Sequence, residues 1–317
     1  MIPKAFITAW RANAPWPEDA QVEQDLVISR ALVSLYATPG LAERLAFRGG
    51  TALYKLHLVP AARYSEDLDF VQVRPEPIGE TLDMIRETLD PWLGEPRRVS
   101  KEGRVNLAYR FSSEDVPPLQ LRLKIEINTR EHFSERGLEM IPISVASPWF
   151  NGSADVTSFS LVELLGTKLR ALYQRKKGRD LFDLWFSLDQ SDSLDVGLLL
   201  QCFHRYMHEG GHRVSRAQLE ENLHHKAADP DFRADVPPLL RHDIDWDFDR
   251  AMEEVCEQIV SRLPGDAWAG RPWRRGGTRA STPASAGGRA ANPKALRRSS
   301  FRPRLASRST SCPPCAV

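Results

Sequence analysis

The segment at residues 48–70 constrains the fold more than any other part of the chain, because it places two glycines and then two aspartates close together. Apolar side chains surround Asp67 and Asp69, which predicts a strand whose successive side chains point to opposite faces. The two carboxylates therefore share one face and are close enough to bind the same divalent cation. Without a metal ion, a proton or another cation to neutralise them, they would repel each other.

The glycines before this strand predict a turn that opens a short helix. Backbone N–H groups of such a turn, together with a helix N-terminus, suit a phosphate, so Gly49, Gly50 and Thr51 are candidate phosphate ligands. An isolated Asp-x-Asp pair is more often a solvated strand face, here with Arg63 as a surface partner. The upstream glycine turn, with Ser65 beside the acids, favours a metal and nucleotide site instead, and with it nucleotidyl transfer.

A second strand with clear alternation is predicted at residues 119–128, where Lys124, Glu126 and Asn128 share one face. Taken alone, this pattern favours a cross-strand ion pair on an exposed face. A third carboxylate on a neighbouring strand is, however, what a two-metal site requires. Glu126 is therefore a candidate for a third metal ligand, or for the base that deprotonates an attacking hydroxyl.

Positive charge is concentrated in a predicted pair of helices at residues 160–189. Lys168 and Arg175 are seven residues apart, so two helical turns bring them to one face, and four of the five residues at 175–179 are cations. This run suits a triphosphate, because Lys acts as a point charge and Arg as a bidentate fork. Lys168, Arg175 and Arg179 are therefore candidate nucleotide ligands.

Two acidic residues follow this basic run. Asp180 and Asp183 are spaced i and i+3, so they share a helix face. The alternative for the whole region is an ordinary helical hairpin, with solvated cations and an ion pair between Arg179 and Asp183.

Charge is distributed unevenly along the chain. The net charge of the 317 residues is +1, yet residues 265–317 contain ten Arg and one Lys but one Asp, which gives +10 and leaves −9 on residues 1–264. The basic segment has few large aliphatic side chains, so it cannot bury enough apolar surface to offset the entropy cost of ordering, and we expect it to be disordered. Its Cys312-Pro-Pro-Cys315 motif lacks the second ligand pair of a zinc site.

The remaining pattern predicts a mixed α/β domain at 1–155, a helical domain at 156–264 and a disordered basic tail at 265–317. Helices are predicted at 18–37, 41–45, 78–93, 160–173, 179–189, 194–208, 215–226, 232–242 and 246–263, and strands at 67–71, 105–111, 119–128 and 140–145.

No apolar run approaches the roughly 18 residues needed to span a bilayer, and the N-terminus lacks the apolar stretch of a signal peptide. We therefore expect a cytoplasmic protein without a membrane partner. Cys202 and Cys256 lie in helical patterns and are expected to be ordinary buried thiols.

Together, these segments resemble the nucleotidyltransferase AbiEii/AbiGii toxin family, within the DNA polymerase beta-like nucleotidyltransferase superfamily. The resemblance covers roughly residues 20–263 and rests on residues 48–53, 63–70, 124–126, 168–172 and 179–184. It implies an α+β fold, with a small mixed sheet and helices followed by a helical C-terminal half. It also implies the toxin half of a bacterial type IV toxin–antitoxin pair, with a separately encoded antitoxin and a role in phage defence by abortive infection.

The resemblance assigns roles to the candidate residues. It implies that Gly49, Gly50 and Thr51 lie against the triphosphate, that Asp67 and Asp69 hold magnesium, that Glu126 is the third motif carboxylate, that Lys168 contacts the nucleotide phosphates and that Asp180 is the acid of the last motif.

The predicted reaction is transfer of NMP from an NTP to an acceptor hydroxyl, dependent on Mg²⁺ or Mn²⁺ and with release of pyrophosphate. The 3′ end of a tRNA is one acceptor, which the basic tail could approach through phosphate contacts. The acidic body leaves a protein or small-molecule acceptor open. Two alternatives remain: a catalytically silent NTP-binding interaction protein, against which the intact Asp67, Asp69 and Glu126 argue, and a nucleic-acid-binding module that acts through residues 265–317.

Overall fold

A seven-stranded mixed sheet organises the N-terminal part of the computed structural model, which describes residues 2–190 and 194–270. The strand order is β3-β4-β5-β2-β1-β7-β6. The strands are β1 (Leu45–Arg48), β2 (Asp67–Gln72), β3 (Arg97–Lys101), β4 (Arg104–Ser112), β5 (Gln120–Asn128), β6 (Leu138–Ala146) and β7 (Asn151–Phe159). β2 pairs with β5 in parallel and β1 with β7 in parallel, whereas the other pairs are antiparallel.

Helices α1 (Lys4–Trp10), α2 (Asp19–Ala37) and α4 (Gly79–Leu93) belong to the sheet half. α2 begins with a capping box between Glu18 and Gln21, which satisfies two backbone N–H groups at the helix start. It is buried on most sides, with Leu26, Ile28 and Leu32 fully inaccessible, because it packs on several strands of the sheet and on α4. The apolar cluster of this half is therefore built around α2 and the sheet.

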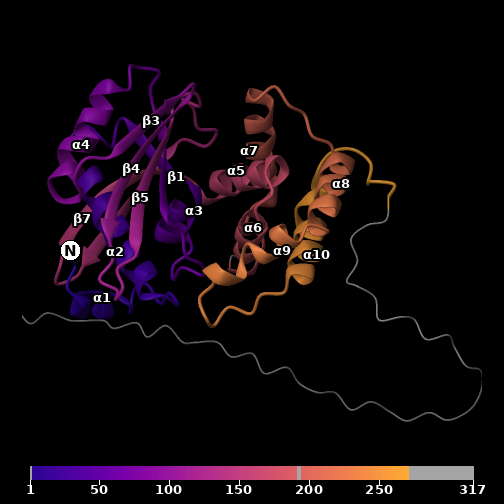
Figure 1. Cartoon of the computed structure of the whole chain (residues 1–317). Helices are drawn as coiled ribbons and strands as arrows, with labels where there is room; N and C mark the ends of the chain where they lie inside the picture. Colours follow the sequence, from indigo (N-terminus) through magenta and orange to yellow (C-terminus); the bar gives the residue numbers. More distant parts are fainter. Residues whose placement is uncertain (1, 191–193, 271–317) are drawn as a thin grey trace, which may run out of the picture. The chain divides into compact units, whose positions relative to one another are not determined.

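The second half is helical (Figure 1). It has its own apolar cluster of buried side chains. Its helices are α5 (Leu161–Gln174), α6 (Gly178–Gln190), α7 (Val196–Glu209), α8 (Arg216–Ala227), α9 (Pro230–Ala234) and α10 (Phe248–Gln258), with short 3₁₀ turns η2 (Pro237–Leu239) and η3 (Val260–Arg262). The cluster also includes Leu53, Tyr54 and Leu58 from the segment after the glycine turn. That segment, α3 (Gly49–Ala52) followed by the π-helical turn η1 (Leu53–His57), thus joins the sheet half to the helical half.

The predicted α+β fold is confirmed, and the predicted strands at 67–71, 105–111, 119–128 and 140–145 all occur with shifts of a few residues at their ends. Two predicted helices are wrong. Residues 41–44 form turns that lead into β1, because Leu45 pairs with Gln72 of β2 instead of continuing a helix. The helix predicted at 232–242 ends at Ala234, before Pro237 and Pro238, which have no backbone N–H to continue it.

The sequence pattern missed α1, β1, β3 and β7. β7 begins with Asn151-Gly152-Ser153, residues that disfavour strands, yet it pairs with β6 over nine positions. All five residues of β3 are exposed, so it has no buried face to give an apolar alternation, and its pairing with β4 defines it.

The described residues all lie within one compact unit. The predicted boundary between residues 155 and 156 falls inside β7, and the division into two domains stays a prediction. Of the predicted tail, residues 265–270 are described: the Trp268 ring lies 4.9 Å from that of His224, and its backbone N–H donates to Glu220. Residues 271–317, with Cys312 and Cys315, lie outside the described residues. Among the helices of the described part, none combines the length and apolarity that crossing a membrane requires.

Candidate active site

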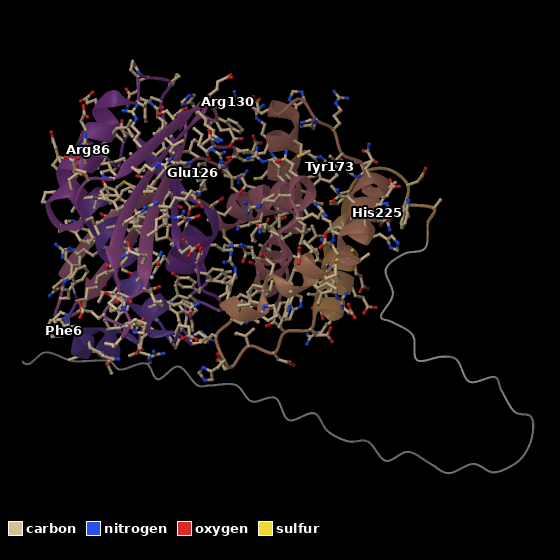
Figure 2. The ribbon with its side chains drawn as sticks, viewed as in Figure 1. Phe6, Arg86, Glu126, Arg130, Tyr173 and His225 are labelled. Carbon is tan, nitrogen blue, oxygen red and sulfur yellow. The ribbon has the colours of Figure 1, made fainter. Side chains whose placement is uncertain are left out.

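Strand pairing brings the three predicted carboxylates together. β2 and β5 run in parallel with Asp67 opposite Lys124 and Asp69 opposite Glu126. All four side chains line one cleft of ≈ 320 Å³, and Glu126 is labelled on β5 in Figure 2. The predicted shared face of Asp67 and Asp69, and the neighbouring strand that supplies Glu126, are thus present.

The charges of these carboxylates are only partly balanced. Burial, followed by the negative charges of Asp67 and Glu126, raises the pKa of Asp69 to about 6. Burial alone would also raise the pKa of Glu126, but hydrogen bonds from Lys124 and Arg104 lower it. Asp69 is therefore the carboxylate that gains most from an added cation.

Lys124 places a positive charge directly between two of these carboxylates. Its Nζ atom lies 3.3 Å from Asp67 Oδ2 and 3.0 Å from Glu126 Oε2, and Arg104 Nη1 lies 3.1 Å from Glu126 Oε1. Within the described ranges, no group of three or more His, Cys, Asp or Glu side chains is arranged to hold a metal ion. The three carboxylates nevertheless fit Mg²⁺ or Mn²⁺ chemically, because hard divalent cations prefer oxygen ligands and because Arg48 and Lys124 only partly offset the burial and acidic neighbours that raise the pKa of Asp69.

The glycine turn packs directly on this site. Gly49 has a φ of +85°, and a Cβ atom there would lie 2.2 Å from Asp69 Oδ2. A Cβ atom on Gly50 would lie 2.7 Å from Arg63 Nη2. Any larger residue would thus push the acidic strand or Arg63 away, which accounts for both glycines.

Thr51 fixes the turn to the acidic strand. Its buried hydroxyl donates to the backbone oxygen of Asp67 at 2.5 Å and lies 2.9 Å from Ser65 Oγ. The Thr51 side chain is therefore committed inside the protein, whereas Ser65 and both glycines line the cleft.

The opposite wall of the cleft comes from α5 and the loop after it. Lys168 Nζ lies 2.8 Å from Asp183 Oδ2 and 3.4 Å from Asp180 Oδ1. Arg175 binds Asp180 through two hydrogen bonds, of 2.7 and 2.8 Å. Asp180 is fully buried, so its carboxylate positions Lys168 and Arg175, and those two cations face the cleft.

Sequence reasoning missed the role of Arg63. Its side chain is 1% exposed and donates to both oxygens of Asp183, at 2.7 and 2.8 Å. Tyr54 donates to Asp183 Oδ1 at 2.9 Å. Burial alone would raise the pKa of Asp183, but the charges of Arg63 and Lys168 hold it well below its usual range. Arg63 is thus a buried link between the sheet half and α6, and the alternative that made it a surface partner of the aspartates is wrong.

The alternative ion pair between Arg179 and Asp183 is also wrong. Arg179 instead binds Asp235 with its backbone N–H at 3.0 Å and its guanidinium at 3.2 and 3.3 Å. Arg179 still lines the cleft, together with Lys177.

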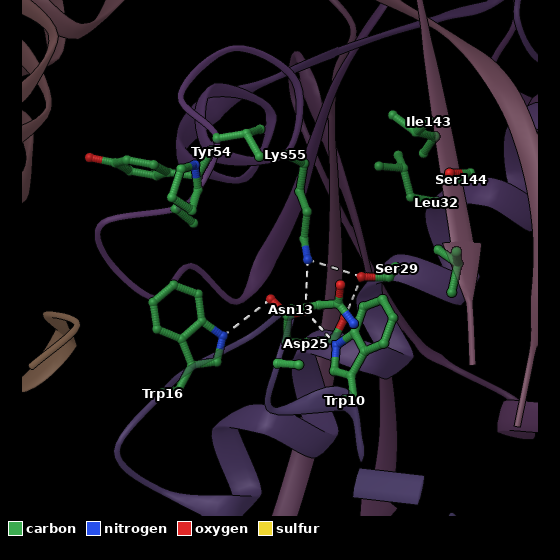
Figure 3. Close-up of a pocket in the computed structure, with 15 residues that line it drawn as sticks. Trp10, Asn13, Trp16, Asp25, Ser29, Leu32, Tyr54, Lys55, Ile143 and Ser144 are labelled. Atoms are coloured by element: carbon green, nitrogen blue, oxygen red, sulfur yellow. Dashed lines mark hydrogen bonds and ion pairs between the residues drawn. The ribbon is translucent and has the colours of Figure 1, made fainter. Parts of the chain in front are cut away.

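A separate cavity of ≈ 310 Å³ lies beside the N-terminal helices (Figure 3). Figure 3 shows the indole N–H groups of Trp10 and Trp16 and the ammonium group of Lys55 converging on Asp25, at 2.9, 3.2 and 2.7 Å. These groups satisfy one another, so this cluster stabilises the packing of α1 and α2 and offers no free group for chemistry.

Known proteins with a similar sequence or fold include nucleotidyltransferases. A family model described as "Nucleotidyl transferase AbiEii toxin, Type IV TA system" matches residues 30–254. Among solved structures, MenT4, a nucleotidyltransferase toxin from Mycobacterium tuberculosis, aligns with a TM-score of 0.56 and 18% identity over 83% of this chain and 91% of its own. JHP933 from Helicobacter pylori aligns with a TM-score of 0.48 and 20% identity over 76% of this chain and 90% of its own. No curated protein sequence matches the chain significantly. The likeness to MenT4 shows a shared fold.

Proposed function

The chain belongs to the AbiEii nucleotidyltransferase toxin family and is a nucleotidyltransferase, and from that premise we propose that it transfers NMP from an NTP to an acceptor hydroxyl with release of pyrophosphate. One observation carries the proposal: Asp67, Asp69 and Glu126 stand on adjacent strands in a cleft whose other wall presents Lys168 and Arg175. Carboxylates facing cations across one cleft suit a metal-bound triphosphate.

We propose that Asp67, Asp69 and Glu126 hold Mg²⁺ or Mn²⁺. When bound, such an ion neutralises the phosphate oxygens and lowers the pKa of the attacking hydroxyl. Burial and the neighbouring acids already raise the pKa of Asp69, which supports a site built for added positive charge.

We assign the donor nucleotide to residues of both walls. The backbone N–H groups of Gly49 and Gly50, with the Ser65 hydroxyl, would bind phosphate oxygens. Lys168 would stabilise the charge that develops on the phosphates, an electrostatic role of the kind that dominates phosphoryl transfer. Arg175 and Arg179, which also line the cleft, would add further contacts to the phosphates.

Asp180 would act through its neighbours. Its buried carboxylate binds Arg175 and Lys168, so we propose a positioning role for it in catalysis. If Asp180 were removed, Arg175 would lose the carboxylate that fixes its guanidinium group, and Lys168 would keep only its ion pair with Asp183.

The type IV toxin–antitoxin description of the family supports a separately encoded antitoxin as a partner. We further propose a cytoplasmic enzyme of phage defence, with the 3′ end of a tRNA as acceptor. The basic residues of 265–317 would assist that acceptor through phosphate contacts.

The test is incubation of the protein with each α-labelled NTP, Mg²⁺, bulk RNA and lysate protein. We expect one or more NTPs to label an acceptor, and expect Asp67→Ala and Lys168→Ala to abolish labelling while the proteins remain folded. NTP binding without any label transfer would instead support the silent NTP-binding protein. Absence of transfer from every nucleotide to every acceptor would refute the proposed reaction.

A further inference from the structure

The cleft continues past the carboxylates into a second lobe. The first lobe, of ≈ 320 Å³, contains Gly50, Ser65, Lys177 and Arg179, and we call it the glycine lobe. The second, of ≈ 310 Å³, contains Arg48, Asn128, Arg170 and Gln174, and we call it the arginine lobe. Gly49, Asp69, Glu126, Lys168 and Arg175 line both lobes. Asp69 and Glu126, two of the three candidate metal carboxylates, thus stand at the junction, where a transfer reaction needs one substrate on each side, and Asp67 lines the glycine lobe alone.

Two arginines in the arginine lobe share a single acid. Arg170 donates to Glu131 at 2.6 and 3.2 Å, and Arg48 donates to the same carboxylate at 2.7 Å. One carboxylate neutralises one of the two guanidinium groups, so this cluster carries a net positive charge. The Arg48 and Arg170 side chains remain 22% and 13% exposed, which leaves them accessible to a ligand.

This cluster is held rigidly. Arg170 also lies over the ring of Tyr206, 5.0 Å from its centre. Burial would raise the pKa of Glu131, but the hydrogen bond from Arg170 and the charge of Arg48 lower it to about 2. The arginines are therefore fixed before a ligand arrives, which reduces the entropy cost of binding.

Two amides in the arginine lobe can still recognise a ligand. Asn128 Oδ1 accepts from the backbone N–H groups of Arg130 and Glu131, which leaves its amide N–H₂ group as a donor. Gln174 lines the lobe and is exposed, and its side chain makes no hydrogen bond to another residue in the described part of the chain. Fixed cations beside uncommitted amides suit a phosphate next to hydroxyl or base edges.

In-line transfer decides which lobe takes which substrate. The attacking oxygen enters opposite the leaving pyrophosphate. The glycine lobe holds the glycine turn and the additional cations Lys177 and Arg179, so it suits the triphosphate and its leaving group. The attacking hydroxyl must then approach from the arginine lobe.

We infer that the arginine lobe is the acceptor site, and that the acceptor carries a phosphate close to its attacking hydroxyl, as the end of a nucleic-acid strand does. This inference rests on the proposed function. In the reaction, the acceptor oxygen forms a bond to the α-phosphorus, the bond from that phosphorus to the bridging oxygen breaks, and pyrophosphate leaves with the electron pair. The hydroxyl proton passes to a base, for which Glu126 is placed in both lobes.

The test separates the two lobes by kinetics. Arg170→Gln changes the arginine lobe and Lys177→Gln, the matched control, changes the glycine lobe. Bulk RNA serves as acceptor in the labelled transfer assay, and NTP affinity is measured by equilibrium binding of a labelled NTP with Mn²⁺. Since a hydrogen bond to a charged group contributes about 1.5–3 kcal/mol, we expect Arg170→Gln to raise the half-saturating RNA concentration roughly tenfold or more. The NTP affinity of Arg170→Gln should stay within about twofold of wild type. Lys177→Gln should instead weaken NTP binding and leave the half-saturating RNA concentration unchanged.

A second variant tests the arginine lobe without removing a contact that could stabilise the fold. Gln174→Glu adds a negative charge at an exposed position without removing a hydrogen bond of the described structure, and Gln258→Glu on α10 is its matched control. We expect Gln174→Glu alone to weaken RNA use.

Each contrary outcome is informative. Unchanged RNA dependence in both Arg170→Gln and Gln174→Glu, with active wild-type protein, overturns the inference and leaves the proposed function standing. Label on protein instead of RNA overturns the phosphate-bearing acceptor. A wild-type protein that transfers label to nothing refutes the proposed function itself, and the inference with it.

Discussion

Lys124 and Asp67 face each other across the β2–β5 pair, with the Lys124 ammonium nitrogen 3.3 Å from Asp67 Oδ2. The same nitrogen lies 3.0 Å from Glu126. Lys124 therefore occupies the space between two candidate metal ligands. Burial alone would lower the pKa of Lys124, but the negative charges of Asp67 and Glu126 outweigh it and raise that pKa. This ammonium group offsets the repulsion between the two carboxylates, and it would compete with a divalent cation for the same oxygen atoms.

The first prediction concerns metal affinity. Lys124→Met removes the competing cation, so the nucleotide-free protein should bind Mn²⁺ more tightly, by roughly fivefold if the two partly buried ion pairs contribute about 1 kcal/mol together. Electron paramagnetic resonance titration of free Mn²⁺ measures this directly. Lys101→Met, on the exposed strand β3, should leave the affinity unchanged. Weaker Mn²⁺ binding by Lys124→Met would show that Lys124 supports the ion instead of competing with it.

The second prediction concerns pH and Asp69. Its folded pKa, raised by burial and then by Asp67 and Glu126, is about 6, against an ordinary value of 3.8. A raised pKa means that the folded state holds the proton more strongly, so stability is fully present below pH 3.8 and is lost as the pH rises through 6. Asp69→Asn should therefore stabilise the metal-free protein at pH 8, by about 1–2 kcal/mol after allowance for solvent screening.

Thermal unfolding in EDTA at pH 4 and pH 8 checks this sign. The gain from Asp69→Asn should be present at pH 8 and absent at pH 4, and Mg²⁺ should raise the melting temperature of the wild type at pH 8 more than that of the variant. If Asp69→Asn were less stable than wild type at pH 8 in EDTA, the ionised Asp69 carboxylate would not destabilise the fold, and the prediction would be wrong.

The third prediction concerns the buried pair of Arg63 and Asp183. Arg63→Met leaves Asp183 in the interior with one fewer cation, and removing one partner of a buried pair costs about 3–5 kcal/mol. Urea denaturation should show this loss in the free energy of unfolding. Arg86→Met, which breaks the exposed pair with Asp90 on α4, is the control and should cost less than about 1 kcal/mol. Equal effects of the two variants would mean that Arg63 does not link the two halves.

Alternation along β2 and β5 was enough to predict the carboxylate face, because period-two patterning is a local property of each strand. The combination of the glycine turn with Asp67 and Asp69 likewise depends on neighbours in the sequence. The buried role of Arg63 could not be predicted in this way, because its partner Asp183 lies 120 residues away. Nothing local distinguishes a buried arginine from an exposed one.

The arginine lobe was missed for the same reason. Arg48, Glu131 and Arg170 come from β1, the segment after β5 and α5, and meet only in the folded chain. Helical spacing did identify Lys168 and Arg175 as one cluster, and the family resemblance singled out Asp180 as the acid of the last motif, but neither indicated that a fully buried Asp180 would pair with both cations. Long-range ion pairs, more than local patterns, therefore shape the cationic side of the cleft.

The last prediction concerns the basic residues after Gly270, which include ten Arg, one Lys and no acidic residue and so carry +11. A protein that ends at Gly270 keeps the Trp268 contact with His224 and should retain its fold and its NTP affinity. Its half-saturating RNA concentration should rise, and the dependence of that concentration on salt should become shallower, because fewer phosphate counterions are released on binding. Transfer assays at two salt concentrations with bulk RNA measure both effects. If NTP binding or folding disappears together with RNA use, the basic residues serve the enzyme body and not the acceptor.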